Sequence, residues 1–356
     1  MLLYIHIPFC DSKCFYCAFN SYTDKFHLKN EYMKSLNKQL EYELENYVKP
    51  NGLTFETVFI GGGTPSTIKS EMYNEIFNTF KPYLQHNAEI TTEANPNSAN
   101  LEWLKGMKSL GVNRVSFGVQ SFNDEKLKKL GRSHKSKSAK EAIKNASKVG
   151  FENGINCDII YGVAGDDLDL IKSDLSTAFS LPITHLSAYS LTIEEGTKFF
   201  DNPKMKIDDE ELSYEVFEFI EENGFKQYEI SNFSKSKDYE STHNYGYWEH
   251  KEYLGVGSGA VGYWNNNRRY PTKVIEDYVQ NPFNIELEEI DENDIKVEKI
   301  LLGFRCSNGV QLDLFTNEEL KKVNILVDED KLEIKQNRLY NKNFLLADEL
   351  ALYIID

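Results

Sequence analysis

The sequence predicts an α/β protein, with an open, partial barrel of six strand–helix units followed by a small C-terminal module. Three observations predict this architecture. Apolar runs alternate with helical segments over the first 230 residues. The chain then becomes aromatic, glycine-rich and aperiodic up to about residue 290, and helical segments return beyond it.

Each predicted strand is a short apolar run that ends near a polar or glycine-rich turn. The runs cover residues 2–9, 57–63, 89–95, 114–120, 154–162 and 185–192. Helical periodicity follows each run, over 27–48, 70–84, 98–111, several segments up to 150, 168–181 and about 208–223. Strands alternating with helices form parallel sheets with right-handed crossovers. Six units rather than eight predict an incomplete barrel with its functional residues at the carboxyl ends of the strands.

We expect three regions along the chain. Residues 1–230 form the barrel core, and residues 231–290 form an aromatic, glycine-rich segment and linker. Residues 291–356 combine helices with a candidate hairpin, a pattern typical of a winged-helix-like module. Such modules often bind DNA, but this one is rich in acidic residues, so we do not expect it to bind nucleic acid.

Composition excludes several broad classes of protein. The chain has 356 residues, with 40 Lys and Arg against 56 Asp and Glu, a formal net charge of −16. A nucleic-acid surface needs clustered basic residues to neutralise phosphates. The N-terminus lacks the pattern of a signal peptide, and no apolar run approaches the length of a membrane span. We therefore expect a cytoplasmic protein with at most transient membrane association.

The cysteines give the sharpest chemical signal. Cys10, Cys14 and Cys17 follow the first predicted strand with the spacing C-x3-C-x2-C, whereas Cys157 and Cys306 lie in apolar patterns typical of buried residues. Zinc would need a fourth ligand, for which His6 is a candidate within the strand. A [4Fe–4S] cube held by three thiolates keeps one iron open. S-adenosylmethionine (SAM) carries the amine and carboxylate that could chelate this iron.

This spacing after the first strand of a βα series resembles the signature of the radical SAM family. The resemblance covers the whole chain and implies a [4Fe–4S] cluster on Cys10, Cys14 and Cys17, with SAM bound at the open iron. The segment "GGGTPS" at residues 61–66 follows a strand and opens a helix. It is similar to the family's glycine motif, which receives the methionine amine of SAM, and this assigns Gly62, Gly63 and Thr64 to SAM binding.

Further segments resemble the coproporphyrinogen-oxidase-like branch of that family. They are "SFGVQSF", "LGRSH" and "DIIYG". Polar residues stand in or after the strands of successive predicted units, where they could reach one rim of a barrel. The resemblance assigns the following residues to SAM contacts: Tyr4, Tyr16, Glu93, Gln120, Arg132 and Asp158.

Within this branch the residues resemble the heme chaperones more than the oxygen-independent coproporphyrinogen III oxidases. The oxidase pattern has a further cysteine where this chain has Phe19, and it carries an N-terminal extension for which we expect no room before Cys10. The stretch "HNYGYW" at residues 243–248 fits the chaperone motif H-N-x-x-Y-W. This implies heme binding near His243, with His250 as a neighbouring alternative ligand.

The resemblance therefore implies a heme chaperone, linked to porphyrin metabolism, that binds heme and transfers it to acceptor hemoproteins such as respiratory-chain cytochromes. The alternative is the oxidase, a radical SAM oxidative decarboxylase. A tRNA-modifying radical SAM enzyme would favour a basic surface and a further set of cysteines, neither of which is present. No catalytic residue is assigned, and the sequence leaves open whether SAM is cleaved.

Overall fold

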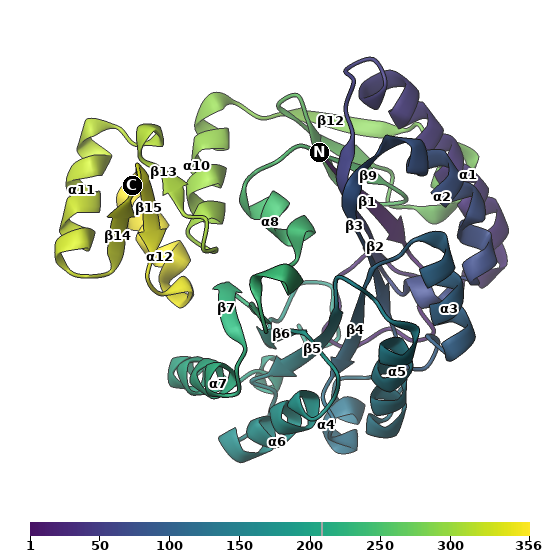
Figure 1. Cartoon of the computed structure of the whole chain (residues 1–356), viewed down its shortest axis with the longest axis horizontal. Helices are drawn as coiled ribbons and strands as arrows, with labels where there is room; N and C mark the ends of the chain where they lie inside the picture. The colour runs from purple at the N-terminus through teal and green to yellow at the C-terminus, as the bar shows by residue number, and fades with distance from the viewer. Residues whose placement is uncertain (208) are drawn as a thin grey trace.

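A single twelve-stranded sheet organises most of the chain, and a three-stranded sheet lies in a separate C-terminal module (Figure 1). The structure is a computed structural model that describes residues 1–207 and 209–356. Residue 208, the predicted start of one helix, lies outside the described residues. Six parallel strands pair in chain order in the middle of the large sheet. They are β1 (Leu2–Ile7), β2 (Phe55–Gly62), β3 (Leu84–Ala94), β4 (Arg114–Gln120), β5 (Ile155–Tyr161) and β6 (His185–Ser190).

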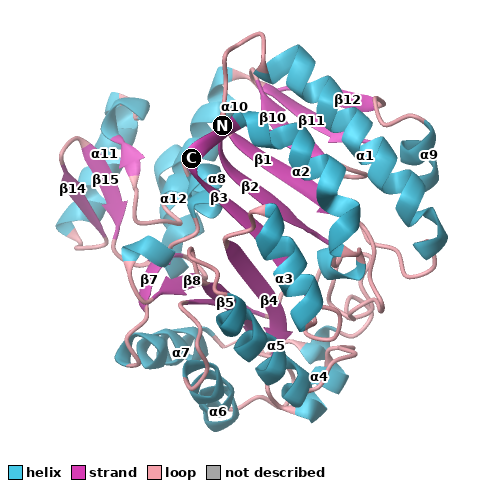
Figure 2. Cartoon of the chain, turned by 45° about the vertical axis from the view of Figure 1, so that its right-hand side comes forward, coloured by secondary structure: helices cyan, strands magenta, loops and turns pink. Residues whose placement is uncertain are grey.

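Helices follow these strands and cover the outer face of the sheet, as Figure 2 shows for α3 and α5. The helices are α1 (Lys29–Glu43), α2 (Asn74–Phe80), α3 (Leu101–Leu110), α4 (Asp124–Lys129), α5 (Ser136–Val149), α6 (Leu168–Phe179) and α7 (Glu210–Glu222). Side-chain caps define several helix starts, because an oxygen of Asn100, Asp167 or Asp209 accepts a backbone N–H of the first turn. The predicted partial barrel of six βα units is confirmed.

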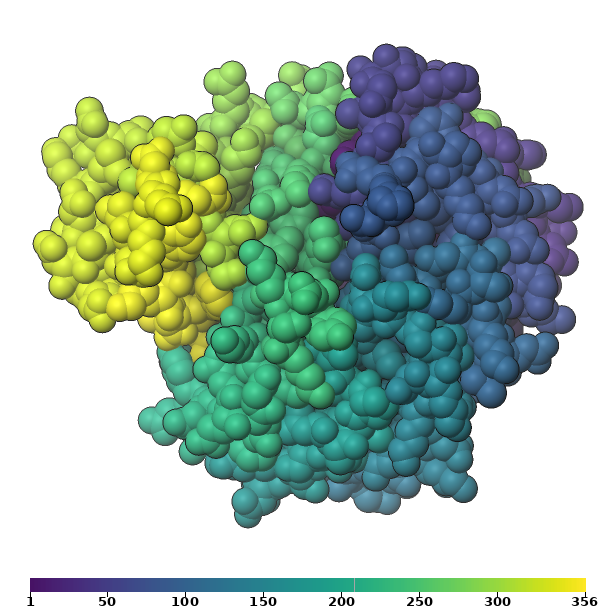
Figure 3. All heavy atoms as spheres, viewed as in Figure 1, coloured from purple at the N-terminus to yellow at the C-terminus, as the bar shows by residue number. Residues whose placement is uncertain are grey.

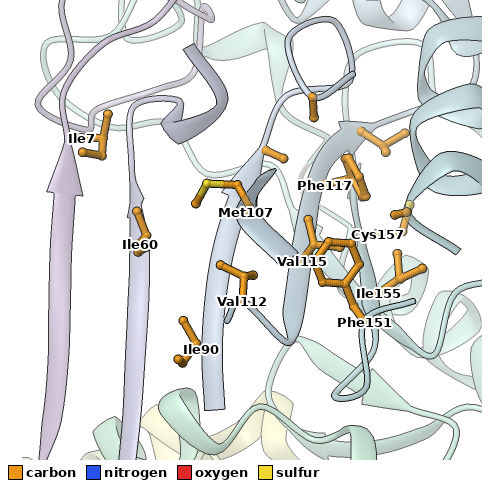
Figure 4. Close-up of a cluster of buried hydrophobic side chains, with 14 of the residues drawn as sticks. Ile7, Ile60, Ile90, Met107, Val112, Val115, Phe117, Phe151, Ile155 and Cys157 are labelled. Atoms are coloured by element: carbon orange, nitrogen blue, oxygen red, sulfur yellow. The ribbon is translucent and has the colours of Figure 1, made fainter. Parts of the chain in front are cut away.

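Side chains alternate between two environments along each parallel strand. One face is apolar and packs under the helices: Figure 4 shows Ile60, Ile90, Val115, Phe117 and Cys157 in this core. The opposite face points into the barrel and carries mostly polar residues. The sequence period of two therefore separates the residues that stabilise the fold from those that form the wall of the barrel.

Both edges of the parallel sheet are extended by short strands. Strands β9 (Tyr253–Val256), β10 (Gly262–Trp264), β11 (Asn267–Pro271) and β12 (Ile285–Glu289) continue from β1, while β8 (Asn232–Ser234) and β7 (Lys226–Glu229) continue from β6. The sequence predicted functional loops here, because runs of three to five residues with glycines show no clear period. The glycines serve close packing, as expected: a Cβ at Gly255 would lie 2.1 Å from the Val261 carbonyl oxygen.

Two further helices belong to this region. α8 (Thr242–Trp248) contains the "HNYGYW" stretch and lies between the large sheet and the C-terminal module, next to α10 (Figure 1). α9 (Ile275–Gln280) packs on α1, with Tyr278 and Tyr32 in ring contact. Short 3-10 or π turns lie at Phe26–Leu28, Leu44–Val48, Pro65–Thr67, Ser70–Tyr73, Lys81–Tyr83, Pro203–Met205, Lys237–Tyr239, Leu312–Leu314 and Phe344–Leu346.

The C-terminal module has its own hydrophobic core and forms a lobe at one side of the molecule (Figure 3). Its elements are α10 (Glu292–Gly303), β13 (Val310–Gln311), α11 (Asn317–Asp328), β14 (Leu332–Lys335), β15 (Arg338–Asn341) and α12 (Ala347–Ile355). A capping box between Thr316 and Glu319 begins α11. Helices around a three-stranded antiparallel sheet confirm the winged-helix-like prediction, whereas the division of the chain at residues 230 and 290 stays a prediction.

Among the described residues, no helix combines the length and the apolar character that crossing a lipid bilayer requires.

A buried ion pair joins the first helix to the extended edge of the sheet. Arg269 on β11 donates to both carboxylate oxygens of Glu43 on α1, at 2.8 and 2.9 Å, and both side chains are buried. The guanidinium also lies 4.3 Å from the centre of the Tyr47 ring. The strands after residue 250 are thus tied to the barrel by a specific polar contact.

Arg269→Ala should lower the free energy of unfolding by about 3–5 kcal/mol, because Glu43 is left as an uncompensated buried charge. Guanidinium denaturation followed by circular dichroism measures the loss. Lys321→Ala removes a solvent-exposed pair with Glu318 and serves as the control, with no change in midpoint expected. A loss below about 1 kcal/mol for Arg269→Ala would show that this edge is not integral to the fold.

Candidate functional site

A cavity of about 630 Å³ lies inside the barrel. The cysteine loop between β1 and α1 forms its wall at the carboxyl ends of the strands. Residues at the amino ends, such as Arg114 and His185, also line it, together with Asn244 of α8. The cavity therefore extends along the whole length of the strands, with α8 at the end opposite the cysteines.

The three predicted cluster ligands, Cys10, Cys14 and Cys17, all line this cavity. The Sγ of Cys10 lies 3.3 Å from Thr64 Oγ1, and Arg132 Nη1 donates to the Sγ of Cys14 at 3.2 Å. Burial raises the pKa values of the Cys10 and Cys17 thiols, so an iron cluster would have to displace their protons. Cys157 and Cys306 are both buried, as predicted, and Cys157 belongs to the main hydrophobic core.

The alternative zinc site finds no support in the geometry of His6. Its Nδ1 bonds to the Tyr4 hydroxyl at 2.9 Å and its Nε2 to the Asn20 carbonyl oxygen at 2.8 Å, so both ring nitrogens are occupied. Across residues 1–207 and 209–356, no three His, Cys, Asp or Glu side chains converge as ligands of a single metal ion. The separate thiols fit a cluster in which each cysteine binds its own iron.

The glycine turn after β2 packs directly against the cysteine loop. Gly63 donates its N–H to the Ile7 carbonyl at 2.8 Å, and a Cβ on Gly63 would lie 2.9 Å from that oxygen and 3.1 Å from the Cys10 Sγ. Gly62 has φ +109° and faces His6, where a Cβ would lie 2.4 Å from Nδ1. Only glycine permits this approach. The turn and the thiols thus form one continuous wall.

Two carboxyl groups face the cavity below this wall. Glu93 on β3 accepts from the Gly62 N–H at 3.0 Å. Burial, and next the neighbouring Asp158 carboxyl, raise the pKa of Glu93 to about 8. Burial also raises the pKa of Asp158, which accepts from Asn156 Nδ2 at 2.6 Å. Carboxyl groups held in this way can bind the hydroxyl groups of a ribose.

Gln120 and Arg132 hold polar atoms that no protein group satisfies. Gln120 ends β4 at a register shift, with φ 68°, and its buried Oε1 has no hydrogen-bond partner. Arg132 donates to the Gly118 carbonyl, but its Nε is also unpartnered. Buried polar atoms without partners are costly, so their presence on a cavity wall indicates a ligand that completes them.

The predicted SAM residues divide into those on the wall and one outside it. The cavity is lined by Tyr16, Gly62, Gly63, Thr64, Glu93, Gln120, Arg132 and Asp158. Tyr4 is not part of the lining, and its hydroxyl is bonded to His6. Contact with SAM stays a prediction for all of these residues, and Tyr4 would need a different arrangement of the wall to reach the cavity.

Several cavity residues were missed by the sequence reasoning. Arg114 lies on the same face of β4 as Gln120, and Asn156 on the same face of β5 as Asp158. Each lies an even number of positions from a predicted site residue on the same strand. This alternation was visible in the sequence and could have identified both residues. Asn232 and Asn244 also line the cavity, but they come from short elements with no such signal.

His243, the predicted heme contact, is buried behind the cavity wall in this structure. Its Nδ1 bonds to Thr57 Oγ1 at 2.6 Å and its Nε2 to the Tyr247 hydroxyl at 3.0 Å, while the ring stacks on Phe59. Glu89 holds the start of α8 by accepting the backbone N–H groups of Thr242 and His243. Burial lowers the pKa of His243 to about 3, so the ring is neutral.

His250 is also engaged. Its Nε2 bonds to Glu298 of α10 at 2.6 Å, and its ring contacts Tyr263. Both ring nitrogens of His243 and the Nε2 of His250 are thus engaged in this structure, and ligation of heme iron by either histidine stays a prediction.

Comparisons with known proteins agree with this geometry. Residues 4–177 match the model of the radical SAM superfamily. The chain is 34% identical over 331 residues to the heme chaperone HemW of Bacillus subtilis, covering 88% of this chain and 86% of the relative. It is 39% identical over 267 residues to HemW of Escherichia coli, covering 73% and 69% of the two chains.

The chain belongs to the HemW family of radical SAM proteins. Among solved structures, coproporphyrinogen III oxidase (HemN) from Escherichia coli, a radical SAM enzyme, superposes with a TM-score of 0.83 over 99% of this chain and 89% of that chain. The identity is 20%, so this likeness shows the fold alone.

Radical SAM membership implies a [4Fe–4S] cluster and SAM, and the residues present fit both groups. Three thiols stand on one wall without converging on a single point, and the glycine turn packs against the cysteine loop at distances that a Cβ would prevent. Gln120 and Arg132, which hold buried unpartnered atoms, line the same cavity. HemW-family membership thus agrees with a cluster site and an adjacent SAM site.

Cys14→Ser should abolish cluster assembly, because a [4Fe–4S] cube needs one ligand for each of the three protein-bound irons. After anaerobic reconstitution, the measured iron content should fall from about four irons per chain to a small residual fraction. The visible absorption of the cluster should fall with it. Cys157→Ala, in the apolar core, is the control and should retain the cluster. Full iron content in Cys14→Ser would contradict the assignment of this loop.

Proposed function

We propose that this protein is a heme chaperone that carries a SAM-ligated [4Fe–4S] cluster, binds heme and transfers it to acceptor hemoproteins. The observation that carries the proposal is the similarity to proteins named heme chaperone HemW, at 32–39% identity over most of both chains. Relatives this similar over such lengths share their fold.

One residue of the cysteine loop favours the chaperone over the oxidase. Phe19 stands where the oxidase pattern has a further cysteine, and its side chain is 67% exposed beside the cavity. An exposed phenyl ring offers apolar contact area in place of a thiol. Coproporphyrinogen III oxidase remains the alternative, because its fold is shared and the cavity holds a full set of candidate SAM residues.

Each part of the wall has a separate task in this proposal. When bound, the cluster would offer SAM an open coordination position on one iron and could donate one electron. The Gly62–Gly63 turn gives the methionine end of SAM access to the backbone, and Arg132 can pair with its carboxylate. Glu93 and Asp158, held toward their neutral forms by burial, can hydrogen-bond the ribose.

We place the heme contact at α8, with His243 as the axial ligand. With Nδ1 donating to Thr57, the Nε2 lone pair is the one that now accepts from Tyr247. Heme binding would exchange this hydroxyl for iron while Thr57 keeps the ring oriented. The half-buried Tyr247 and Trp248 offer flat apolar surface for a porphyrin.

We further propose that the protein works in the cytoplasm and passes heme to respiratory-chain cytochromes, which requires only transient membrane association. The five unpaired cysteines agree with a reducing compartment. The acidic charge of −16 favours small-molecule and protein partners over nucleic acid.

The reconstituted protein should bind heme with a distinct Soret band and leave coproporphyrinogen III unchanged in the presence of SAM and a reductant. Absorption titration with hemin measures the first, and chromatographic product analysis under anaerobic conditions measures the second. HemN assayed in parallel serves as the positive control for decarboxylation. Efficient decarboxylation by this chain would instead establish the oxidase.

His243→Ala should weaken heme binding by about tenfold or more and shift the Soret band, because the axial ligand is lost. Added imidazole should restore the spectrum by occupying the vacated position. His86→Ala, on an exposed residue, is the control. An unchanged spectrum together with a lower melting temperature would identify His243 as an anchor of α8 only.

A further inference from the structure

The end of the cavity opposite the cysteines holds a buried arginine without a partner. Arg114 is the first residue of β4, its side chain is 2% exposed, and it lines the cavity. Its Nε has no hydrogen-bond partner, and within residues 1–207 and 209–356 its guanidinium forms neither a hydrogen bond nor an ion pair. A buried arginine is normally paired, whereas the carboxyl that Arg114 stabilises electrostatically, Asp158, forms no ion pair with it.

The polar groups around Arg114 are already satisfied by one another. Asn156 donates to Ser116, Asp158 and Ser187, and its Oδ1 bonds to His185 Nδ1 at 2.6 Å. His185 Nε2 bonds to the Tyr228 hydroxyl at 2.7 Å. This network fixes the wall and contains no acceptor that is hydrogen-bonded to the Arg114 guanidinium.

Position separates Arg114 from the predicted SAM contacts at the cysteine end of the cavity, Gln120 and Arg132. Arg114 and Gln120 are the first and last residues of β4, so their backbones lie about 20 Å apart at about 3.3 Å per residue. Arg132, which can take the SAM carboxylate, lies at the end where Gln120 and the cysteines stand. Arg114 is therefore available to a second anionic group.

We propose that Arg114 forms an anion subsite at the α8 end of the barrel, which binds the carboxylate of a ligand that lies below SAM. Asn232 and Asn244 line the same cavity and can supply amide donors; the Asn232 Oδ1 is itself unpartnered. A guanidinium binds a carboxylate through two parallel hydrogen bonds. One arginine at this end, with the Glu93 and Asp158 carboxyls along the same wall, favours a monoanionic carboxylate over a phosphate dianion.

The carboxylate could belong to a porphyrin propionate or to a separate small acid. The subsite does not require the heme proposal, because its recognition chemistry is that of the carboxylate alone. The two sources differ in size and in their response to esterification, and both properties can be tested.

The test uses the cluster-reconstituted full chain and its Arg114→Met and Arg114→Lys variants. Probes are succinate, metal-free protoporphyrin IX, its dimethyl ester and inorganic phosphate, each titrated with and without SAM by calorimetry or intrinsic fluorescence. At least one carboxylate probe should bind about 10- to 100-fold more weakly to Arg114→Met, with Arg114→Lys intermediate. Arg338→Met, which removes an arginine of the C-terminal module, should bind the probes like the wild type.

The probes assign the source. If Arg114→Met loses binding of protoporphyrin IX, and the wild type binds the dimethyl ester weakly, the carboxylate is a porphyrin propionate. If Arg114→Met loses only succinate binding, the carboxylate belongs to a small acid. The proposal is overturned if no carboxylate depends on Arg114, if phosphate binds as tightly as the carboxylates, or if SAM displaces the carboxylate competitively. Failure of heme binding leaves the succinate result interpretable, so the two proposals can fail separately.

A stability measurement distinguishes a binding role from a structural one. Because Arg114 is buried without a partner, Arg114→Met should melt at the same temperature as the ligand-free wild type or higher. Arg338→Met should melt lower, since Arg338 donates to the carbonyl groups of Asn308 and Gly309. A melting temperature of Arg114→Met below the wild type by as much as that of Arg338→Met would show that Arg114 supports the fold instead.

Discussion

The contact between the glycine turn after β2 and the chain that leaves β1 is the constraint on which the site depends. The hydrogen bond from Gly63 N–H to the Ile7 carbonyl joins two neighbouring strands at the point where both end. Because a side chain at Gly62 or Gly63 would collide with His6, Ile7 or Cys10, the turn can approach the cysteine loop closely. A cluster on the thiols and a ligand on the turn would thus share one wall, and their relative placement follows from backbone geometry.

The parallel strands then extend this wall inward. Each strand has one apolar face under the helices (Figure 4) and one polar face toward the cavity, so the strands that close the core also aim the polar side chains. The order β1 to β6 brings Glu93, Gln120 and Asp158 together although they lie up to 65 residues apart in the chain. The short edge strands and the Glu43–Arg269 pair hold the open side of this incomplete barrel.

Much of this arrangement could be predicted, because it depends on local periodicity and short spacings. The alternation of strands and helices predicted the six parallel units, and C-x3-C-x2-C after the first strand predicted a three-thiol site. The strands β9 to β11 could not be recognised, because three to five residues carry too little pattern. The burial of His243 also lay beyond the sequence, since it results from Thr57, Phe59 and Glu89, which are more than 150 residues away along the chain.

The polar interior of the barrel is better explained by ligands than by stability. A fold selected for stability alone would pair or replace its buried polar groups, yet Arg114, Gln120 and Arg132 each keep an atom without a partner on the wall of one cavity. Such groups weaken the empty protein and favour states in which something binds. Arg114 and Gln120 place unpartnered atoms at the two ends of β4, whereas Asn156 on the neighbouring strand is fully hydrogen-bonded. This arrangement favours two separate anionic contacts along one cavity, one beside the cluster and one beside α8.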